Sequence, residues 1–259
     1  MKHRFFSVCI CVLAAIALLS ACGSNAHEEQ PDSNSSLWIL MYHTFVRDGQ
    51  DCGDWTTTES HFREDLQWLT DNGYSFVLPS DLAAGEPLPE KAVMLTFDDG
   101  YASNYEIAYP LLQEYNATAV IALITKRIED GKEGFLTWDM CREMLESGIV
   151  EFGSHSHDVH IRSNQGVVRD EGETQEAYEE RVYPDIQTSI DLIKQELGIT
   201  PQYFAYPYGR TEEWIADFIQ ERFDVTVTTT TDKADISSGL YDLPRHNMNN
   251  ESDLSSFMS

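Results

Sequence analysis

The chain has 259 residues and is 42% hydrophobic, which suffices for one domain with a substantial core. Its 17 lysines and arginines stand against 44 aspartates and glutamates, giving a formal net charge of −27. Nucleic-acid binding needs a basic surface that replaces the counterions of the phosphates, so this balance argues against a nucleic-acid partner. An acidic surface is compatible with a neutral substrate and would attract a cationic product, although solubility alone also explains it.

The N-terminal residues have the pattern of a signal peptide. Residues 2–4 are basic, and residues 5–19 form an almost uninterrupted apolar run that is short for a membrane-spanning helix. The sequence Leu19-Ser20-Ala21-Cys22 resembles a bacterial lipobox, which implies cleavage after residue 21 and lipid attachment at Cys22. A plain signal peptide with a chance cysteine is the alternative. We therefore expect an extracytoplasmic protein, anchored to the bacterial cell membrane through Cys22.

Residues 22–36 are predicted to be a flexible tether, because they lack apolar periodicity and are rich in Ser, Asn, Glu and Pro. The folded domain is then expected over residues 37–259. It contains Cys52 and Cys141, which could pair in an oxidising compartment but form no recognisable disulfide or metal motif.

Strand-like and helix-like segments alternate along this domain. In chain order, the pattern predicts a strand over 37–43, a helix over 60–73, a strand over 92–97, a helix over 105–115, a strand over 117–124, a helix over 137–147, a strand over 149–152, a helix over 186–197, a strand over 203–206, a helix over 212–222 and a strand over 225–229. Gly73 ends the first helix, and Pro110 marks a kink or a first turn in the second.

This alternation, with near-continuous apolar strands, predicts an α/β fold in which helices cover a parallel sheet. About six or seven units favour a distorted or incomplete barrel over an open doubly wound sheet. A dinucleotide-binding fold is not expected, because no strand leads into Gly-x-Gly-x-x-Gly. Residues 162–185, rich in Glu, Asp and Gly, interrupt the pattern and are interpreted as a surface excursion beside the site, with 173–181 as a possible solvated helix face.

Asp98 and Asp99 directly follow the predicted strand 92–97. In parallel α/β folds, reactive side chains gather at the carboxyl ends of the strands. Two adjacent carboxylates repel each other as anions, and a cation bound by one of them would leave the other as a base. The alternative is an Asp-Asp-Gly turn without function, since Asp and Gly are ordinary turn residues.

A cluster of three histidines, His155, His157 and His160, follows the predicted strand 149–152. Imidazole is a common ligand for zinc-like ions, and one carboxylate with two imidazoles leaves coordination positions open for water and substrate. The sequence therefore indicates a metal site shared by the two strand ends. The part played by His157 stays open between ligand, supporting hydrogen-bond donor and exposed residue.

These segments resemble the polysaccharide deacetylase family, also called the NodB homology domain or carbohydrate esterase family four. Thr96-Phe97-Asp98-Asp99-Gly100 matches its first motif, and His155-Ser156-x-x-x-His160 matches a longer form of its second. The resemblance implies a distorted (β/α)7-like barrel as a single catalytic domain. It also implies that Asp98 is the general base and that Asp99, His155 and His160 bind the metal.

The third family motif is matched less completely by residues 204–209. Ala205 stands where the family has an arginine that orients the catalytic aspartate, so the resemblance implies that Asp98 lacks this support. It also implies an oxyanion and substrate-binding role for Tyr206, Pro207 and Tyr208, with the backbone N–H of Tyr208 as the oxyanion donor. A Pro-Gly turn with core aromatics is the alternative.

Two histidines compete for the role of general acid. His246 follows Leu243-Pro244-Arg245 in an altered form of the usual C-terminal motif. His43, in Met41-Tyr42-His43, resembles the histidine of a circularly permuted branch that includes poly-N-acetylglucosamine deacetylases. We favour His43, whose alternative is a histidine with a structural hydrogen bond at the end of a strand.

We therefore expect a metal-dependent hydrolase that removes acetyl groups from a polysaccharide, with N-acetylglucosamine units as the expected substrate. We expect the protein to be a monomer. Zinc is the expected metal, with cobalt or nickel as alternatives. An acetylxylan O-deacetylase and a catalytically impaired carbohydrate-binding lipoprotein remain open. An Asp-x-Asp phosphatase is disfavoured, because Gly100 stands where its second aspartate is needed.

Overall fold

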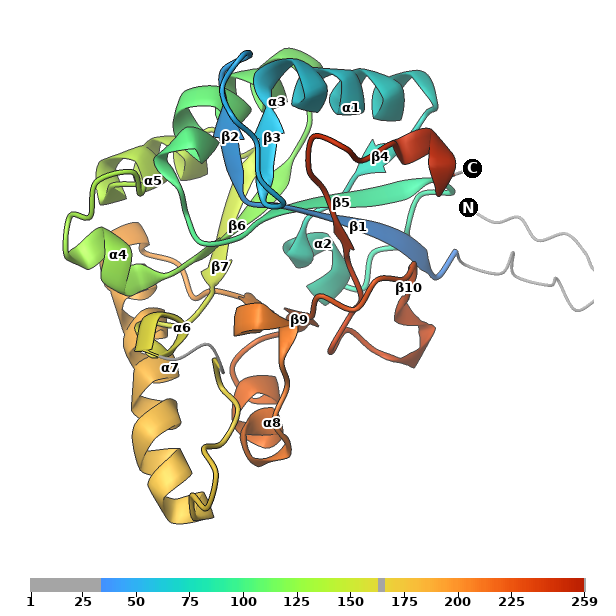
Figure 1. Cartoon of the computed structure of the whole chain (residues 1–259). Coiled ribbons are helices and arrows are strands. Elements are labelled where there is room, and N and C mark those ends of the chain that lie inside the picture. The colour runs from blue at the N-terminus through green and yellow to red at the C-terminus, as the bar shows by residue number, and fades with distance from the viewer. Residues whose placement is uncertain (1–33, 163–165, 259) are drawn as a thin grey trace, which may run out of the picture. The chain divides into compact units, whose positions relative to one another are not determined.

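A curled, mostly parallel sheet forms the centre of this computed structural model, which describes residues 34–162 and 166–258 (Figure 1). The predicted signal peptide, Cys22 and most of the tether lie outside the described residues. Within the described ranges, no helix is long and apolar enough to cross a membrane. Cys52 is exposed and Cys141 is buried, and both are free thiols.

The sheet has nine strands within the described part of the chain. Its main path runs through β10 (Ala234–Asp235), β1 (Ser36–Tyr42), β5 (Ala92–Phe97), β6 (Ala119–Leu123), β7 (Val150–Ser154), β8 (Tyr203–Ala205) and β9 (Val225–Val227). In addition, β4 (Ser75–Phe76) pairs with β5, and β11 (His246–Asn247) pairs with β1. All these pairings are parallel except that of β10 with β1. A separate parallel pair consists of β2 (Thr44–Val46) and β3 (Thr56–Thr58).

Helices cover the outside of this sheet (Figure 1). They are α1 (Glu59–Asp71), α2 (Pro79–Ala83), α3 (Tyr109–Tyr115), α4 (Thr125–Glu129), α5 (Trp138–Glu146), α6 (Val159–Arg162), α7 (Gln175–Leu197) and α8 (Glu213–Gln220). A π-helical turn, Asn104–Ala108, precedes α3, so Pro110 lies in the first turn of that helix.

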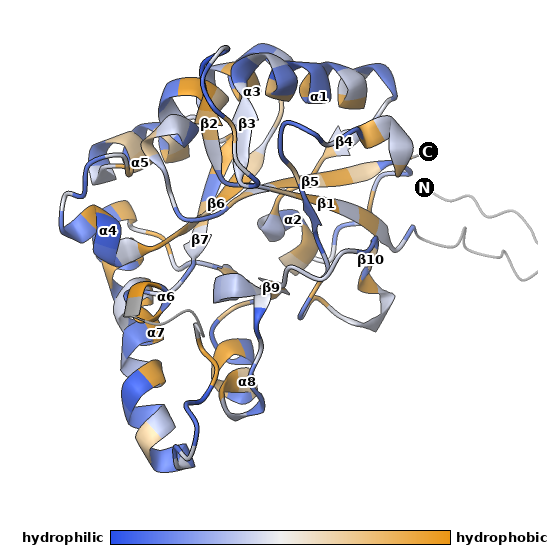
Figure 2. Ribbon diagram, in the orientation of Figure 1, coloured by the Kyte–Doolittle hydropathy of each residue, from blue (hydrophilic) through white to orange (hydrophobic). Residues whose placement is uncertain are grey.

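The strands alternate between an inner and an outer apolar cluster, as expected for a sheet buried on both faces. On β5, Val93, Leu95 and Phe97 pack outward with α1 and α3, whereas Ala92 and Met94 belong to the inner cluster. Figure 2 shows the hydrophobic colouring along β1, β5 and β6 that this burial requires. The same alternation, continued past the end of β5, places the side chain of Asp98 on the inner face of the sheet.

The predicted fold class is confirmed, and each predicted strand corresponds to a strand of the sheet. The start predicted for the helix at 186 is wrong, because α7 begins at Gln175 and contains Pro184. Tyr178, Val182 and Ile186 are buried one turn apart on this helix. The second half of the supposed surface excursion 162–185 is therefore a packed helix. Proline normally ends a helix, which obscured this periodicity.

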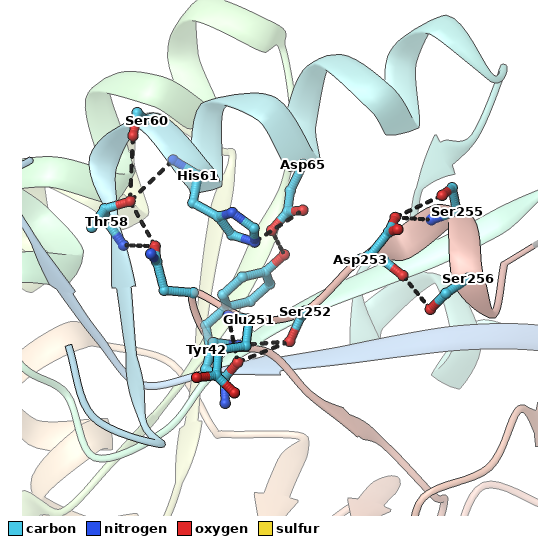
Figure 3. Close-up of polar contacts among 12 residues, drawn as sticks. Tyr42, Thr58, Ser60, His61, Asp65, Glu251, Ser252, Asp253, Ser255 and Ser256 are labelled. Atoms are coloured by element: carbon cyan, nitrogen blue, oxygen red, sulfur yellow. Dashed lines mark hydrogen bonds and ion pairs between the residues drawn. The ribbon is translucent and has the colours of Figure 1, made fainter.

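The C-terminal segment returns across the first elements of the fold. Asn250 Oδ1 accepts hydrogen bonds from the N–H and the hydroxyl of Thr58, the residue that caps α1, at 3.2 and 2.7 Å. Tyr42, at the end of β1, donates from its hydroxyl to Asp65 Oδ2 of α1 at 2.9 Å (Figure 3). The C-terminal segment and β1 are thus both tied to α1.

Candidate active site

Asp99, His155 and His160 converge at the carboxyl ends of β5 and β7. Asp99 Oδ1 lies 3.5 Å from the Nε2 atom of each histidine, and one donor atom from each residue lies within 4.8 Å of the others. Asp99 Oδ1 is also buried without a hydrogen-bond partner. A buried carboxylate oxygen left unpaired between two imidazole nitrogens fits a divalent cation, because the cation would satisfy all three donors.

The two histidines are held with their Nε2 atoms toward Asp99. His155 Nδ1 lies 2.7 Å from the backbone oxygen of Ala205 and donates to it in the tautomer that leaves Nε2 free. The ring of His160 stacks on Tyr208 at 4.5 Å, and the Tyr208 hydroxyl donates to the backbone oxygen of His160. Burial lowers the pKa of each histidine to about 4, so both are neutral, as metal ligands must be.

The loop between these histidines is anchored by Asp185 of α7. Its carboxylate accepts hydrogen bonds from the backbone N–H groups of residues 157, 158 and 159 at 2.9 to 3.0 Å. His157 is separate from the three donors, because its Nδ1 lies 3.0 Å from Thr125 Oγ1 and its Nε2 lies 3.8 Å from a carboxylate oxygen of Glu129. The structure thus places His157 as a supporting residue of the loop.

Asp98 forms a bidentate ion pair with Arg245 inside the curled sheet. The two terminal nitrogens of Arg245 donate to Asp98 Oδ1 and Oδ2 at 2.8 and 2.7 Å, and its Nε donates to the backbone oxygen of Thr228 at 2.8 Å. Burial by itself would raise the pKa of Asp98, but the Arg245 guanidinium outweighs it and holds that pKa well below its usual range. Asp98 is therefore an oriented, ionised carboxylate.

The expectation that Asp98 lacks an arginine is wrong. Ala205 does stand at the family position, but Arg245 supplies the guanidinium from the C-terminal segment. Leu243 bridges to Val227 of β9, and His246 pairs with Leu40 of β1, so this segment spans the gap between the two ends of the curled sheet. Side chains alternate along an extended segment, and Arg245 consequently points inward.

The same alternation places His246 outside. Its ring stacks on Phe257 at 4.4 Å and contacts Trp38 edge-on at 5.0 Å. An extended Arg-His pair cannot direct both side chains to one face, so the sequence already held a signal for Arg245. That signal was usable only once residues 243–247 were known to be extended.

Asp98, Asp99, His155, His160, His43 and Tyr208 line a single cavity of about 320 Å³, together with Trp55, Tyr101 and Thr229. His246, Tyr206 and Pro207 are not among its lining residues. Tyr206 is instead buried, and that burial raises its pKa above the usual value, so the phenol stays protonated at neutral pH. Of the two candidate acids, only His43 therefore reaches the cavity.

His43 contacts Trp55, with ring centroids 4.6 Å apart. Its Nδ1 is buried and has no hydrogen-bond partner within the described chain. Burial lowers the pKa of His43 to about 4 against the opposing charge of Asp98, so the imidazole is neutral at neutral pH. The hydroxyl of Tyr101, whose pKa burial raises to about 12, donates a hydrogen bond to Asp99.

A sequence model of the polysaccharide deacetylase family matches residues 85–225, more than half of the chain. The chain therefore belongs to the polysaccharide deacetylase family, a class of hydrolases. Asp98, Asp99, His155 and His160 lie inside the matched range. His43 and Arg245 lie outside it, which separates the local motifs from the residues that the fold adds.

Two of the curated relatives share the name of an N-acetylglucosamine-polymer deacetylase. The poly-beta-1,6-N-acetyl-D-glucosamine N-deacetylase of Escherichia coli strain K12 is 29% identical over 243 residues, covering 76% of this chain and 36% of the relative. The chain thus spans about a third of that relative's length. The enzyme of the same name from Staphylococcus aureus strain MSSA476 is 25% identical over 238 residues, covering 81% of this chain and 80% of the relative.

Solved structures agree with the fold. A de-N-acetylase from Aggregatibacter actinomycetemcomitans matches with a TM-score of 0.76 and 26% identity, covering 86% of this chain and 98% of that one. The Streptococcus pyogenes deacetylase PplD, in complex with acetate, matches with a TM-score of 0.72 and 25% identity, covering 86% and 96%. The resemblance inferred from the motifs is thereby confirmed.

Proposed function

We propose that the chain removes N-acetyl groups from the N-acetylglucosamine units of an extracytoplasmic polysaccharide. One observation carries this proposal: the ionised Asp98 and the three donors Asp99, His155 and His160 line the same cavity. Hydrolysis of an acetyl group needs a base for the attacking water and a means of stabilising the charge on the acetyl oxygen. The E. coli and S. aureus relatives, by their names, support N-acetylglucosamine as the sugar.

Asp99, His155 and His160 would hold the cation, and zinc is our first choice, with cobalt or nickel as alternatives. When bound, a divalent cation polarises the acetyl carbonyl and makes a water molecule more acidic. Asp98 accepts the proton of that water, and Arg245 fixes the direction of its carboxylate. We assign stabilisation of the tetrahedral oxyanion to the backbone N–H of Tyr208 as well.

His43 passes a proton to the leaving nitrogen. Its neutral imidazole has an unpaired Nδ1 and lines the cavity, so it can take up a proton from solvent and release it to the departing amine. The proton that Asp98 accepts from the attacking water returns to solvent after the acetate leaves, so both residues end the cycle as they began it. The low pKa caused by burial favours the release step. A protonated leaving group is essential here, because an amine anion is too poor a leaving group to depart by itself.

The direct test is acetate release by the purified protein from N-acetylglucosamine oligomers and from acetylxylan, each with and without a chelator. We expect release from the amino-sugar oligomers, loss with the chelator, and recovery on adding back zinc, cobalt or nickel. The Asp98→Asn variant should keep the metal and lose about 100- to 10,000-fold in turnover. Release from acetylxylan alone, or undiminished release by Asp98→Asn, would contradict the proposal.

The alternative of a catalytically impaired, carbohydrate-binding lipoprotein was based on Ala205, which stands where the family has an arginine. Arg245 makes the same kind of ion pair with Asp98, so the reason for expecting impairment is gone. We therefore favour a working hydrolase, and the acetate-release experiment distinguishes it from a binding protein.

We further propose that Cys22 carries a lipid that anchors the protein on the outer side of the cell membrane. The lipobox-like sequence before Cys22 supports this placement. A Cys22→Ser variant should move from the membrane fraction to the soluble fraction of fractionated cells. Unchanged membrane association of that variant would argue for another means of attachment.

A further inference from the structure

Four large apolar side chains are conspicuously exposed in the described part of the chain: Trp55 at 50%, Tyr208 at 40%, Tyr241 at 39% and Ile161 at 37%. Two of them, Trp55 and Tyr208, line the catalytic cavity. Exposed aromatic surface that gathers around a cavity marks a binding site, whereas scattered exposed residues need no explanation.

Each of these two aromatics covers one histidine of the site. Trp55 lies against His43 with a centroid distance of 4.6 Å, and Tyr208 stacks on His160 at 4.5 Å. The hydroxyl of Tyr208 also donates to the backbone oxygen of His160 and is therefore already engaged within the protein. Trp55 is the more exposed of the two, and half of its surface is available to a ligand.

The loop that carries Trp55 is fixed by the same C-terminal segment that supplies Arg245. The side-chain amides of Asn247 and Asn249 both donate to the backbone oxygen of Asp54, at 3.1 and 3.3 Å. The backbone oxygen of Trp55 accepts from the N–H of Thr44 at 3.2 Å. The backbone that carries the indole is therefore held in place before any ligand arrives, which reduces the entropy lost on binding.

The size of the cavity separates the reacting sugar from its neighbours. A volume of about 320 Å³ is at the lower end of the range for small-molecule sites, which suits one sugar residue better than an extended chain. The next residue of a polymer must then lie at the rim. A pyranose presents a face of C–H groups, and an aromatic ring is the protein surface that such a flat, apolar face packs against.

We propose that Trp55 is the platform for the sugar adjacent to the one that is deacetylated. This inference rests on the proposed function, since it names a second subsite for the same polymer. Trp55 acts as a specificity residue, because only a substrate of two or more sugars can use it. The preference for oligomers over short substrates should therefore depend on the indole.

The test compares an N-acetylglucosamine pentamer with a small acetyl ester, 4-nitrophenyl acetate, on the Trp55→Ala and Trp55→Phe variants. The ratio of kcat/KM for the pentamer to that for the ester should fall about 10- to 100-fold in Trp55→Ala, mainly through KM. Phenylalanine should restore most of the ratio. Tyr241→Ala is the matched control, because Tyr241 is similarly exposed but does not line the cavity.

An unchanged ratio in Trp55→Ala would overturn the proposal, and so would an equal loss on both substrates, which would mean that the indole acts only through His43. A fluorescence titration makes the result independent of the proposed chemistry. Amino-sugar oligomers should change the tryptophan emission of the metal-loaded wild-type protein and not that of Trp55→Phe. Wild-type protein that binds oligomers through Trp55 but releases no acetate would refute the proposed function alone, and the absence of any Trp55-dependent binding would refute the platform.

Discussion

The loop of the metal donors and the C-terminal segment that supports Asp98 are built by different means. His155 and His160 lie in one short loop, whose backbone is fixed by the carboxylate of Asp185. Arg245 reaches Asp98 across 147 residues and is placed by strand contacts on both of its sides. The donors are thus specified by local sequence, whereas the support of the base depends on how the sheet is completed.

The two regions also differ in charge. His155 is buried and His160 is half-buried, both as neutral groups, and a cation between them would meet the free lone pairs of their Nε2 atoms. Asp98 and Arg245 are buried as ions, which is tolerable only because the pairing is bidentate and Arg245 Nε also donates to the backbone oxygen of Thr228. Disturbing the first region should therefore cost mainly metal, and disturbing the second should cost both turnover and stability.

The largest effect is expected in the loop. His155→Ala removes one of three donors, so the protein should lose its metal and its acetate release should fall to the level measured with a chelator. His157→Ala is the matched control, because this histidine belongs to the same loop but contacts Thr125 and Glu129 instead of Asp99. Metal analysis of both purified variants, together with acetate release, checks the difference. A metal-free His157→Ala protein would contradict the assignment of the donors.

The second effect is expected in the C-terminal segment. Arg245→Met leaves the Asp98 carboxylate buried without its partner, which should lower the free energy of unfolding by about 3–5 kcal/mol. Turnover should fall about 100-fold or more, because the base is no longer oriented. Urea unfolding and acetate release measure the two losses, with Arg142→Met as a control on a partly exposed arginine.

The double variant Asp98→Asn, Arg245→Met separates orientation from charge. It should regain part of the stability lost in Arg245→Met, because no unpaired carboxylate remains. Wild-type turnover in Arg245→Met would show that the ion pair is structural only, and the comparison between the two regions would then fail.

The strands and the donors could be predicted from the sequence because their signals are local. β5 is apolar at every position up to Thr96 and ends at Phe97, directly before Asp98. The spacing of His155 and His160 is likewise visible in a few residues. Such features depend on neighbours in the chain, and the fold only has to bring two strand ends together.

The support of the base could not be predicted, because its signal depends on tertiary structure. β11 has two residues, too few for any periodicity to appear, and β10 and β4 are equally short. The inward direction of Arg245 follows from pairings with β1 and β9, which are distant in sequence. The start of α7 was missed for a different reason, since Pro184 lies inside the helix.

Asp65, another buried carboxylate, sharpens the contrast with Asp98, because it has no guanidinium partner. Asp65 of α1 accepts one hydrogen bond from the Tyr42 hydroxyl, and its other oxygen lies 3.9 Å from His61 Nε2 (Figure 3). Burial raises its pKa from 3.8 to about 7, with the charges of Glu64 and Asp253 adding to the effect. The direction is opposite to that of Asp98, although both carboxylates are buried.

The raised pKa of Asp65 makes the stability of the folded protein depend on pH. Because the folded protein holds the Asp65 proton more tightly than the unfolded chain, this group contributes stability below about pH 4 and loses that contribution as the pH rises to about 7. Asp65→Asn cannot ionise, so its stability relative to wild type should improve between pH 5 and pH 8, by an amount on the order of 1–3 kcal/mol. Urea midpoints at the two pH values measure this change, with Asp71→Asn, on the exposed face of α1, as the control. An equal difference between Asp65→Asn and wild type at both pH values would mean that Asp65 is ionised throughout, and that a buried carboxylate here needs no guanidinium to keep its charge.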